Sequence, residues 1–167
     1  RAFDLGPVQA TLQAGAYLIP WQQFALAAIN NSLDERPIYF ASSGNAATSL
    51  GLDRYLVRQG LAFRLNLGDP GETASEGVVP MPADSPLNAI TGDWVDAGRT
   101  RLLADQVFVH RGGIPEWDHW PDHATLGIPN YYAWVYYALA QVAQIRGDAD
   151  QFEADRRASD LWALLGS

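Results

Sequence analysis

The stretch that decides the predicted fold is DRYLVRQGLAFRLNL, residues 53–67. In its second half a large apolar residue stands at every second position: Leu61, Phe63, Leu65 and Leu67. This period of two is typical of a half-buried strand. The first half indicates the end of a helical stretch, because Gly60 suits the left-handed backbone of a helix C-cap. The stretch therefore predicts a helix that ends at Gly60 and a strand over 61–67.

A second strand is predicted upstream, in Arg36-Pro-Ile-Tyr-Phe-Ala41. Its proline stands at the start, where a missing N–H donor is tolerated, and Ile38 and Phe40 are expected to share one buried face. A strand, a helical crossover and another strand form a βαβ unit, in which the two strands are parallel. Two strands alone are marginally stable, so a third is expected from 106–110 or from 11–18.

Helices are expected on either side of this unit. Apolar residues recur at helical spacing after Pro20, which predicts an amphipathic helix that ends near Leu33. Its expected inward residues are Trp21, Phe24, Ala25, Ala28 and Ile29. Residues 68–98 hold six carboxylates, four prolines and no cation, which is typical of a long surface loop. A further helix is predicted around 95–104.

The C-terminal residues 130–166 predict an antiparallel helical hairpin. Apolar residues from Tyr131 to Ile145 repeat at alternating spacings of four and three, and Gly147-Asp148 breaks the pattern. Asp150, followed by Glu153, has the form of a capping box for the closing helix. The expected inward stripe of that helix is Ala154, Ala158, Leu161, Trp162 and Leu165. The hairpin resembles one tetratricopeptide-type unit, with no second copy in the sequence.

The predicted fold class is α+β: a small sheet that contains the βαβ unit, with flanking helices, ending in an antiparallel tetratricopeptide-like helical hairpin. A chain of 167 residues fits one soluble domain. Its expected parts are a mixed α/β region over 1–110, a loop over 111–129 and the hairpin over 130–166.

Composition excludes several classes of function. The sequence has no cysteine, so disulfides, thiolate metal ligands and cysteine nucleophiles are ruled out. A net charge of −8 without a visible basic patch argues against nucleic-acid binding. No apolar run approaches the roughly 20 residues that span a bilayer, so direct membrane insertion is not expected. The start at Arg1 and the 18% of charged residues suggest part of a longer polypeptide with one covered face.

The candidate metal site lies in the segment 116–123. This segment holds five potential zinc or iron ligands: Glu116, Asp118, His119, Asp122 and His123. Pro121 stands between the two histidines and argues against a continuous helix that would present both to one ion. The favoured interpretation is a polar loop whose Trp117 and Trp120 pack on the hairpin. No cofactor is predicted.

Two other groups are candidates for contact with a ligand or partner. Ser42, Ser43 and Asn45 follow the predicted strand 36–41, at a place where backbone N–H groups can hold an anion or a sugar hydroxyl. No phosphate-loop lysine follows, and capping of a helix by Ser43 or Asn45 is the favoured interpretation. The second group is an aromatic cluster with rings that can stack on a sugar, although core packing is favoured. Its members are Trp117, Trp120, Tyr131, Tyr132 and Trp134.

Catalytic residues are not predicted. Neither Ser42 nor Ser43 lies in a G-x-S-x-G elbow, and no spacing of acid and histidine identifies a Ser-His-Asp triad. The acidic residues of 148–155 do not follow the ligand pattern of an EF-hand, because Phe152 and Ser159 occupy ligand positions.

Several short motifs are spread along the chain. The most specific is Arg36-Pro-Ile-Tyr-Phe-Ala41, preceded by Gly15-Ala-Tyr-Leu-Ile-Pro20 and Asn30-Asn31. Others are Tyr55-Leu56, Gly60-Leu-Ala-Phe-Arg64, Val95-Asp96 and the hairpin from Asn130-Tyr131 to Gly147-Asp148. Together they resemble the soluble C-terminal region of a bacterial family of multi-spanning membrane proteins of unknown function. That family is grouped with protein O-mannosyltransferase-like glycosyltransferases.

The resemblance implies an upstream membrane domain that binds a lipid-linked sugar donor and carries the catalytic acid, so no catalytic residue is assigned here. It implies a non-catalytic, extracytoplasmic C-terminal domain that contacts the membrane domain of the same polypeptide. Such a domain would assist the binding of a glycan or protein acceptor, or of a partner. Two alternatives remain: a protein-interaction module that uses the hairpin, and a metal-dependent hydrolase that uses His119 and His123.

Overall fold

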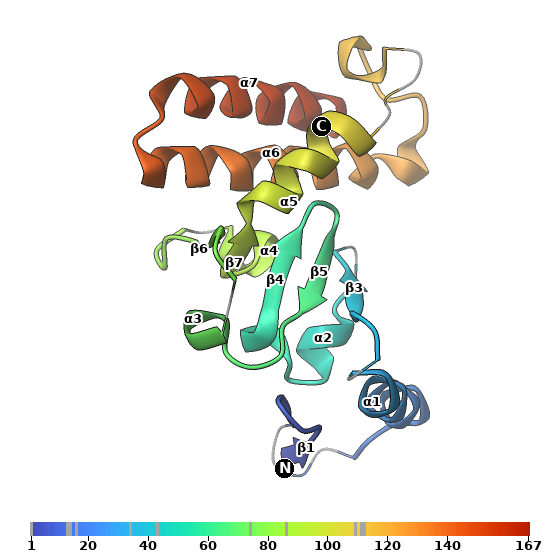
Figure 1. Ribbon diagram of the computed structural model, residues 1–167. Coiled ribbons are helices and arrows are strands. Elements are labelled where there is room, and N and C mark those ends of the chain that lie inside the picture. Colours follow the sequence, from blue (N-terminus) through green and yellow to red (C-terminus); the bar gives the residue numbers. More distant parts are fainter. Residues whose placement is uncertain are drawn as a thin grey trace.

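A five-stranded sheet forms the middle of the computed structural model, and α6 (Gly127–Arg146) and α7 (Ala149–Leu165) pack across one end of it (Figure 1). α5 (Ala97–Leu102) connects the sheet to this hairpin. α1 (Pro20–Ser32) and a two-stranded sheet of β1 (Ala2–Asp4) and β2 (Gln9–Thr11) lie at the opposite end. The structure describes residues 2–12, 15, 17–33, 35–42, 44–73, 75–85, 87–108, 110 and 113–167.

The strands of the larger sheet are short and mixed in direction. They are β3 (Tyr39–Ala41), β4 (Leu56–Gln59), β5 (Ala62–Leu65), β6 (Val78–Pro80) and β7 (Trp94–Asp96). Their order is β3-β5-β4-β7-β6, and each neighbouring pair is antiparallel except β4 with β7. β4 is the central strand, and Val57, Arg58 and Gln59 within it are buried.

The prediction of a helix that ends at Gly60 is wrong. Asp53–Tyr55 form one turn of 3-10 helix, and the chain then extends into β4. Gly60 has the expected left-handed backbone, with a φ of +63°, but it turns β4 back onto β5 as an antiparallel hairpin. β4 is a strand because it pairs on both edges, with β5 and β7, so tertiary context outweighs its local propensity.

The predicted βαβ unit is also wrong, because β3 and β5 are antiparallel, with Phe40 opposite Phe63. In the described residues between β3 and β4 there is one short helix, α2 (Ala46–Ser49), besides the 3-10 turn. None of the described residues of the two candidates for a third strand joins this sheet: Thr11 ends β2 in the two-stranded sheet, and Gln106 belongs to the π-helical turn Leu103–Val107. Gln13, Ala14 and Ala16 lie outside the described residues. Val109 lies outside the described residues.

The strand predicted over 36–41 forms as β3, which lies at the edge of the sheet. Tyr39 in β3 is 48% exposed. Ile38 and Phe40 are half-buried and pack against the same hydrophobic cluster, which confirms that they share a face.

Residues 68–98 hold regular structure where a long loop was predicted. They include α3 (Pro70–Thr73), β6, α4 (Asn88–Thr91) and β7. β6 pairs with β7, with Val79 opposite Val95, because burying two valine-containing segments against each other removes apolar surface from water. The helix expected around 95–104 is confirmed by α5, which continues into the π-helical turn.

α1 confirms the predicted helix, and its inward face is partly as predicted, because Ile29 is buried and Ala25 packs against the hydrophobic core. Leu26, Ile29 and Leu33 are buried, whereas Trp21 is 43% and Phe24 is 77% exposed. The buried residues also follow helical spacing, so the sequence offers two apolar faces and the hydrophobic core selects one of them.

The helical hairpin is confirmed as an antiparallel pair. The hydroxyl of Ser159 donates to the carbonyl of Ala133 at 2.9 Å, which joins the late part of α7 to the early part of α6. The N-cap of α7 is Asp148 rather than the predicted Asp150, and its Oδ1 accepts a hydrogen bond from the backbone N–H of Gln151 at 3.1 Å. Among the described residues, no helix is both long and apolar enough to cross a membrane.

The inward stripe of α7 is only partly as predicted. Trp162 and Leu165 are buried, but Ala154 is exposed and Leu161 is 51% exposed. Asp155 takes an inward position, at 2% exposure, because Arg101 of α5 forms an ion pair with it. A buried charge is tolerated where a partner of opposite sign is present, and hydrophobic periodicity alone does not identify such a position.

Candidate functional site

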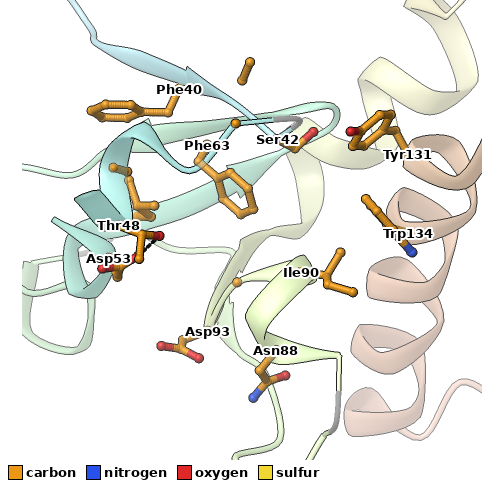
Figure 2. Close-up of a pocket in the computed structure, with 15 residues that line it drawn as sticks. Phe40, Ser42, Thr48, Asp53, Phe63, Asn88, Ile90, Asp93, Tyr131 and Trp134 are labelled. Atoms are coloured by element: carbon orange, nitrogen blue, oxygen red, sulfur yellow. Dashed lines mark hydrogen bonds between the residues drawn. The ribbon is translucent and has the colours of Figure 1, made fainter. Parts of the chain in front are cut away.

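A cavity of about 320 Å³ lies between the first turns of α6 and the sheet (Figure 2). Residues from β3, α2, β5, α4 and α6 line it. The cavity therefore depends on packing the hairpin against the end of the sheet, and its lining comes from segments far apart in the sequence.

Aromatic rings form one wall of the cavity. Tyr131 and Trp134 project from α6, where a spacing of three residues places them on one helix face. Their ring centroids are 5.0 Å apart and the rings are nearly perpendicular, at 89°. This edge-to-face contact is a favoured aromatic geometry and holds the two rings in fixed orientations. Phe40 and Phe63 add rings from the sheet.

Polar side chains lie opposite that wall. Figure 2 shows Thr48 and Asp53 across the cavity from Trp134, joined by a hydrogen bond in which the Thr48 hydroxyl donates to Asp53 Oδ1 at 2.6 Å. Asp93 is a second exposed carboxylate on the rim. The cavity thus sets hydrogen-bond acceptors against apolar ring faces.

Asn88 brings an amide to the same cavity from α4. Its Nδ2 donates to the carbonyl of Pro82 at 2.7 Å, which fixes the side chain. Its Oδ1 is buried and has no hydrogen-bond partner among the described residues. Buried acceptors of this kind are uncommon in folded proteins and often mark a place where a further polar group binds.

Arg58 supports the cavity from behind. Its guanidinium is fully buried and lies 4.5 Å from the ring centroid of Phe63. It donates to the carbonyls of Gly60 and Ile90, at 2.9 and 2.7 Å. Burial lowers the pKa of Arg58 to about 10, so the group remains charged at neutral pH. Phe63 and Ile90 line the cavity, so Arg58 fixes two of its lining residues.

The charge of the lining restricts the ligand. Asp53 and Asp93 are the charged residues among those that line the cavity, and none of the described lining residues is arginine or histidine. Two carboxylates disfavour phosphates and other anions, and they accept hydrogen bonds from hydroxyl groups. An uncharged ligand with an apolar face and peripheral hydroxyls matches this lining.

The sequence-predicted contact residues are only partly brought together. Ser42 lines the cavity, and Figure 2 shows its side chain facing that of Tyr131. Ser43 lies outside the described residues, and Asn45 precedes α2 without a side-chain capping bond, so capping by Asn45 is wrong. The predicted aromatic cluster separates into two groups, because Trp117 and Trp120 lie in the segment 113–126, ahead of α6, with their ring centroids 5.8 Å apart.

The candidate metal ligands do not form a metal site in the described structure. Glu116, Asp118 and His119 line a surface hollow with Trp117. Across the described part of the chain, which includes all five candidate ligands, no group of three or more histidine and carboxylate side chains is arranged to hold a metal ion. Asp122 instead caps the 3-10 turn that begins at His123, accepting from the backbone N–H of Ala124 at 2.9 Å.

Sequence reasoning missed most of the polar and supporting residues. The sequence predicted a helical stretch that includes Asp53 and Arg58, a strand that includes Phe63, and a loop that includes Asn88 and Asp93. None of these residues was given a functional role. One signal was present: Arg58 stands beside Val57 in a short apolar segment, and a charged residue there indicates a specific buried partner.

Comparisons with known protein families, with curated proteins and with solved structures give no match to this chain. The interpretation of the cavity accordingly rests on its geometry and chemistry.

Proposed function

We propose that this chain is a non-catalytic carbohydrate-binding domain that assists acceptor binding in a membrane-bound, glycosyltransferase-like protein. The observation that carries the proposal is the cavity in which the rings of Tyr131 and Trp134 stand opposite the Asp53 and Asp93 carboxylates. A pyranose ring presents C–H groups on its faces and hydroxyls around its edge. At this site its C–H face would contact the aromatic rings, and its hydroxyls would donate hydrogen bonds to the carboxylates.

The proposed role is binding, and Ser42 is not proposed as a catalytic nucleophile. None of the three histidines lines the cavity, so a general base of that type is not beside Ser42. The Ser42 hydroxyl is already engaged, since it donates to the carbonyl of Leu61 at 2.6 Å. Catalysis in the proposed parent protein would come from its membrane domain, as the resemblance of Arg36–Ala41 implies. The domain would lie on the extracytoplasmic side.

Binding is tested by titrating the chain with neutral oligosaccharides of the gluco- and manno-series, with calorimetry or ligand-observed NMR as the readout. Trp134→Ala should weaken binding by at least about tenfold, because it removes both ring area and the partner that orients Tyr131. Trp117→Ala, at a tryptophan outside the cavity that is 39% exposed, is the matched control and should bind normally.

Two results would contradict the proposal. If no member of either series binds, the cavity is not a site for neutral sugars of these types. If oligosaccharides are cleaved during the titration, the role is not confined to binding.

Truncating the domain from the parent protein should raise the KM for the acceptor while the affinity for the sugar donor stays unchanged.

A second candidate is a protein-interaction module, and exposed apolar residues on the hairpin favour it. Leu161 is 51% and Leu164 is 70% exposed, and both stand near the C-terminal end of α7. Apolar side chains at neighbouring helical positions are typical of a docking face. Leu164→Ser would abolish capture of a protein partner under this function and leave sugar binding unchanged.

A further inference from the structure

A second hollow adjoins the cavity and extends it along α6. It has a volume of about 330 Å³ and is lined by Ala41, Ser42, Leu61, Ile128, Tyr131 and Tyr132. Three of these residues, Ala41, Ser42 and Tyr131, also line the first cavity. We propose that the two spaces are adjoining subsites and that the ligand is an oligosaccharide of at least two rings. This inference rests on the proposed carbohydrate binding.

The two subsites meet at Ser42 and Tyr131. Figure 2 shows these side chains facing each other, Ser42 from the end of β3 and Tyr131 from α6. The Ser42 hydroxyl donates its hydrogen to Leu61, so its oxygen remains an acceptor. A ligand that occupies both spaces therefore passes between a hydroxyl oxygen and a tyrosine ring, which suits the link between two sugar rings.

The second subsite differs from the first in polarity. Its lining contains no carboxylate and includes Ile128, which is 42% exposed, and Leu61. The first subsite holds Asp53, Asp93 and Asn88. The first therefore selects and orients a ring by hydrogen bonds, and the second adds apolar contact with a neighbouring ring.

The wall of the second subsite is fixed in advance of binding. Tyr132 stacks on Trp162 with a centroid distance of 4.5 Å and an angle of 21°. His110 and Phe108 meet the Tyr132 ring edge to face, at 5.0 and 5.6 Å. A ring held by three aromatic neighbours loses little conformational freedom when a ligand contacts it, so the contact contributes to affinity.

The test is the dependence of affinity on ligand length. The full chain is titrated with the monosaccharide, disaccharide and trisaccharide of the gluco- and manno-series. Affinity should rise about tenfold or more from the monosaccharide to the disaccharide, because the second ring adds buried contact without a second full cost of association. It should change little from the disaccharide to the trisaccharide.

Ile128→Ser identifies where the second ring binds. The side chain is exposed, so the variant is expected to fold, and it should remove most of the gain from the second ring while leaving monosaccharide affinity unchanged. Ile145→Ser is the matched control, since Ile145 is a similarly exposed isoleucine near the other end of the same helix. It should retain the full dependence on length.

The outcomes separate this inference from the proposed function. Equal affinity for one and two rings, or a loss of monosaccharide binding in Ile128→Ser, overturns the second subsite while carbohydrate binding stands. Failure of every sugar to bind overturns both proposals. Binding of uncharged peptides in place of sugars would also overturn both proposals. It would indicate that the two adjoining subsites beside β3 hold an extended peptide chain.

Discussion

The two sides of the candidate site are built by opposite means. On one side stands α6, a helix of 20 residues that packs along most of its length on the 17-residue α7. On the other side stand strands and helices of three or four residues each, joined by turns. The helical side contributes the rings of Tyr131 and Trp134, and the sheet side contributes the carboxylates and the amide in addition to the rings of Phe40 and Phe63.

This difference shows where each kind of chemistry is easiest to hold. A long helix with a buried face holds large rings at fixed spacing, since neighbouring turns place residues three apart together. Short segments that end at a sheet edge present polar groups while their backbones stay paired or exposed to water. The arrangement of side chains on the helical side follows from residue spacing within one helix, whereas that on the sheet side depends on contacts between segments far apart in the sequence.

Gly51→Ala should have the largest effect and break the sheet side alone. Gly51 has a φ of +65°, and a Cβ there would stand 1.8 Å from the carbonyl oxygen of Thr11. Backbone must move to relieve such a clash, so the free energy of unfolding should fall by about 4 kcal/mol or more. Urea unfolding, followed by circular dichroism, measures it.

Gly147→Ala is the matched control on the helical side. Gly147 also has a positive φ, of +73°, but a Cβ there would meet no atom within 4 Å. The cost is then the backbone conformation alone, about 1 kcal/mol. Equal losses of stability in the two variants would show that the close approach of the Thr11 backbone to Gly51 does not constrain the sheet side.

Arg101→Ala should loosen the connection between the two sides. Arg101 of α5 donates from Nη1 to Asp155 Oδ1 of α7 at 2.8 Å, and Asp155 is 2% exposed. The hydrogen bond to Asp155 raises the pKa of Arg101. Removing the arginine leaves a buried carboxylate whose remaining partner is Gln151, so stability should fall by about 3 kcal/mol.

Two variants make this result specific. Arg101→Met combined with Asp155→Leu removes both charges and should recover much of the stability, because an apolar pair of similar volume replaces a buried ion pair at little cost. Arg156→Ala removes an exposed arginine that pairs with Glu153 and Asp160 and should change stability little. A loss of stability in Arg156→Ala as large as that in Arg101→Ala would contradict the expectation that a buried ion pair costs more to break than an exposed one.

The same contrast explains which parts of the fold could be predicted. The hairpin was predicted because its periodicity extends over many turns and Gly147 ends the first helix. The β4–β5 hairpin was missed because Leu56 to Gln59 carry no alternation: the strand pairs on both edges and three of its four residues are buried. Pairing with β7 and β5 decides that conformation, and neither partner is visible in the local sequence.

The candidate site was predicted to the same limited degree. Ser42, Tyr131 and Trp134 were candidates for ligand contact, although a turn and core packing were the favoured interpretations, and all three line the cavity. Asp53 and Asp93 were missed because acidic residues in turns are ordinarily solvated, and only the packed sheet brings both to one cavity. The segment from Glu116 to His123 shows the reverse, since its five potential metal ligands are close in sequence but are not grouped around one point in the structure.

Asp93→Asn should alter the chemistry of the sheet side without altering its fold. Loss of the negative charge weakens a hydrogen bond accepted from a sugar hydroxyl, so oligosaccharide affinity should fall by about 1 kcal/mol, or roughly fivefold. Calorimetric titration with the tightest-binding sugar measures the change. Asp84→Asn, at an exposed carboxylate outside the cavity lining, is the control and should leave affinity unchanged.

His110, behind the helical side, should give the smallest effect, a dependence of stability on pH. Its ring lies 4.7 Å from that of Trp162, and its Nε2 is buried without a hydrogen-bond partner among the described residues. Desolvation lowers the pKa of His110 below the usual 6.5, although the Glu116 carboxylate partly opposes this shift. Well above pH 6.5 both the folded and the unfolded state hold a neutral imidazole, so His110 contributes no pH dependence to stability there.

As the pH falls below about 6.5, the unfolded state takes up the proton first, so the free energy of unfolding decreases until the folded-state pKa is passed. His110→Phe keeps an aromatic ring against Tyr132 and Trp162 and should remove this part of the slope. Urea unfolding between pH 5 and 7 measures it. His123→Gln, at an exposed histidine, is the control and should keep the pH dependence of the unfolding free energy. If that pH dependence persists in His110→Phe, the aromatic packing does not disfavour the charged imidazole.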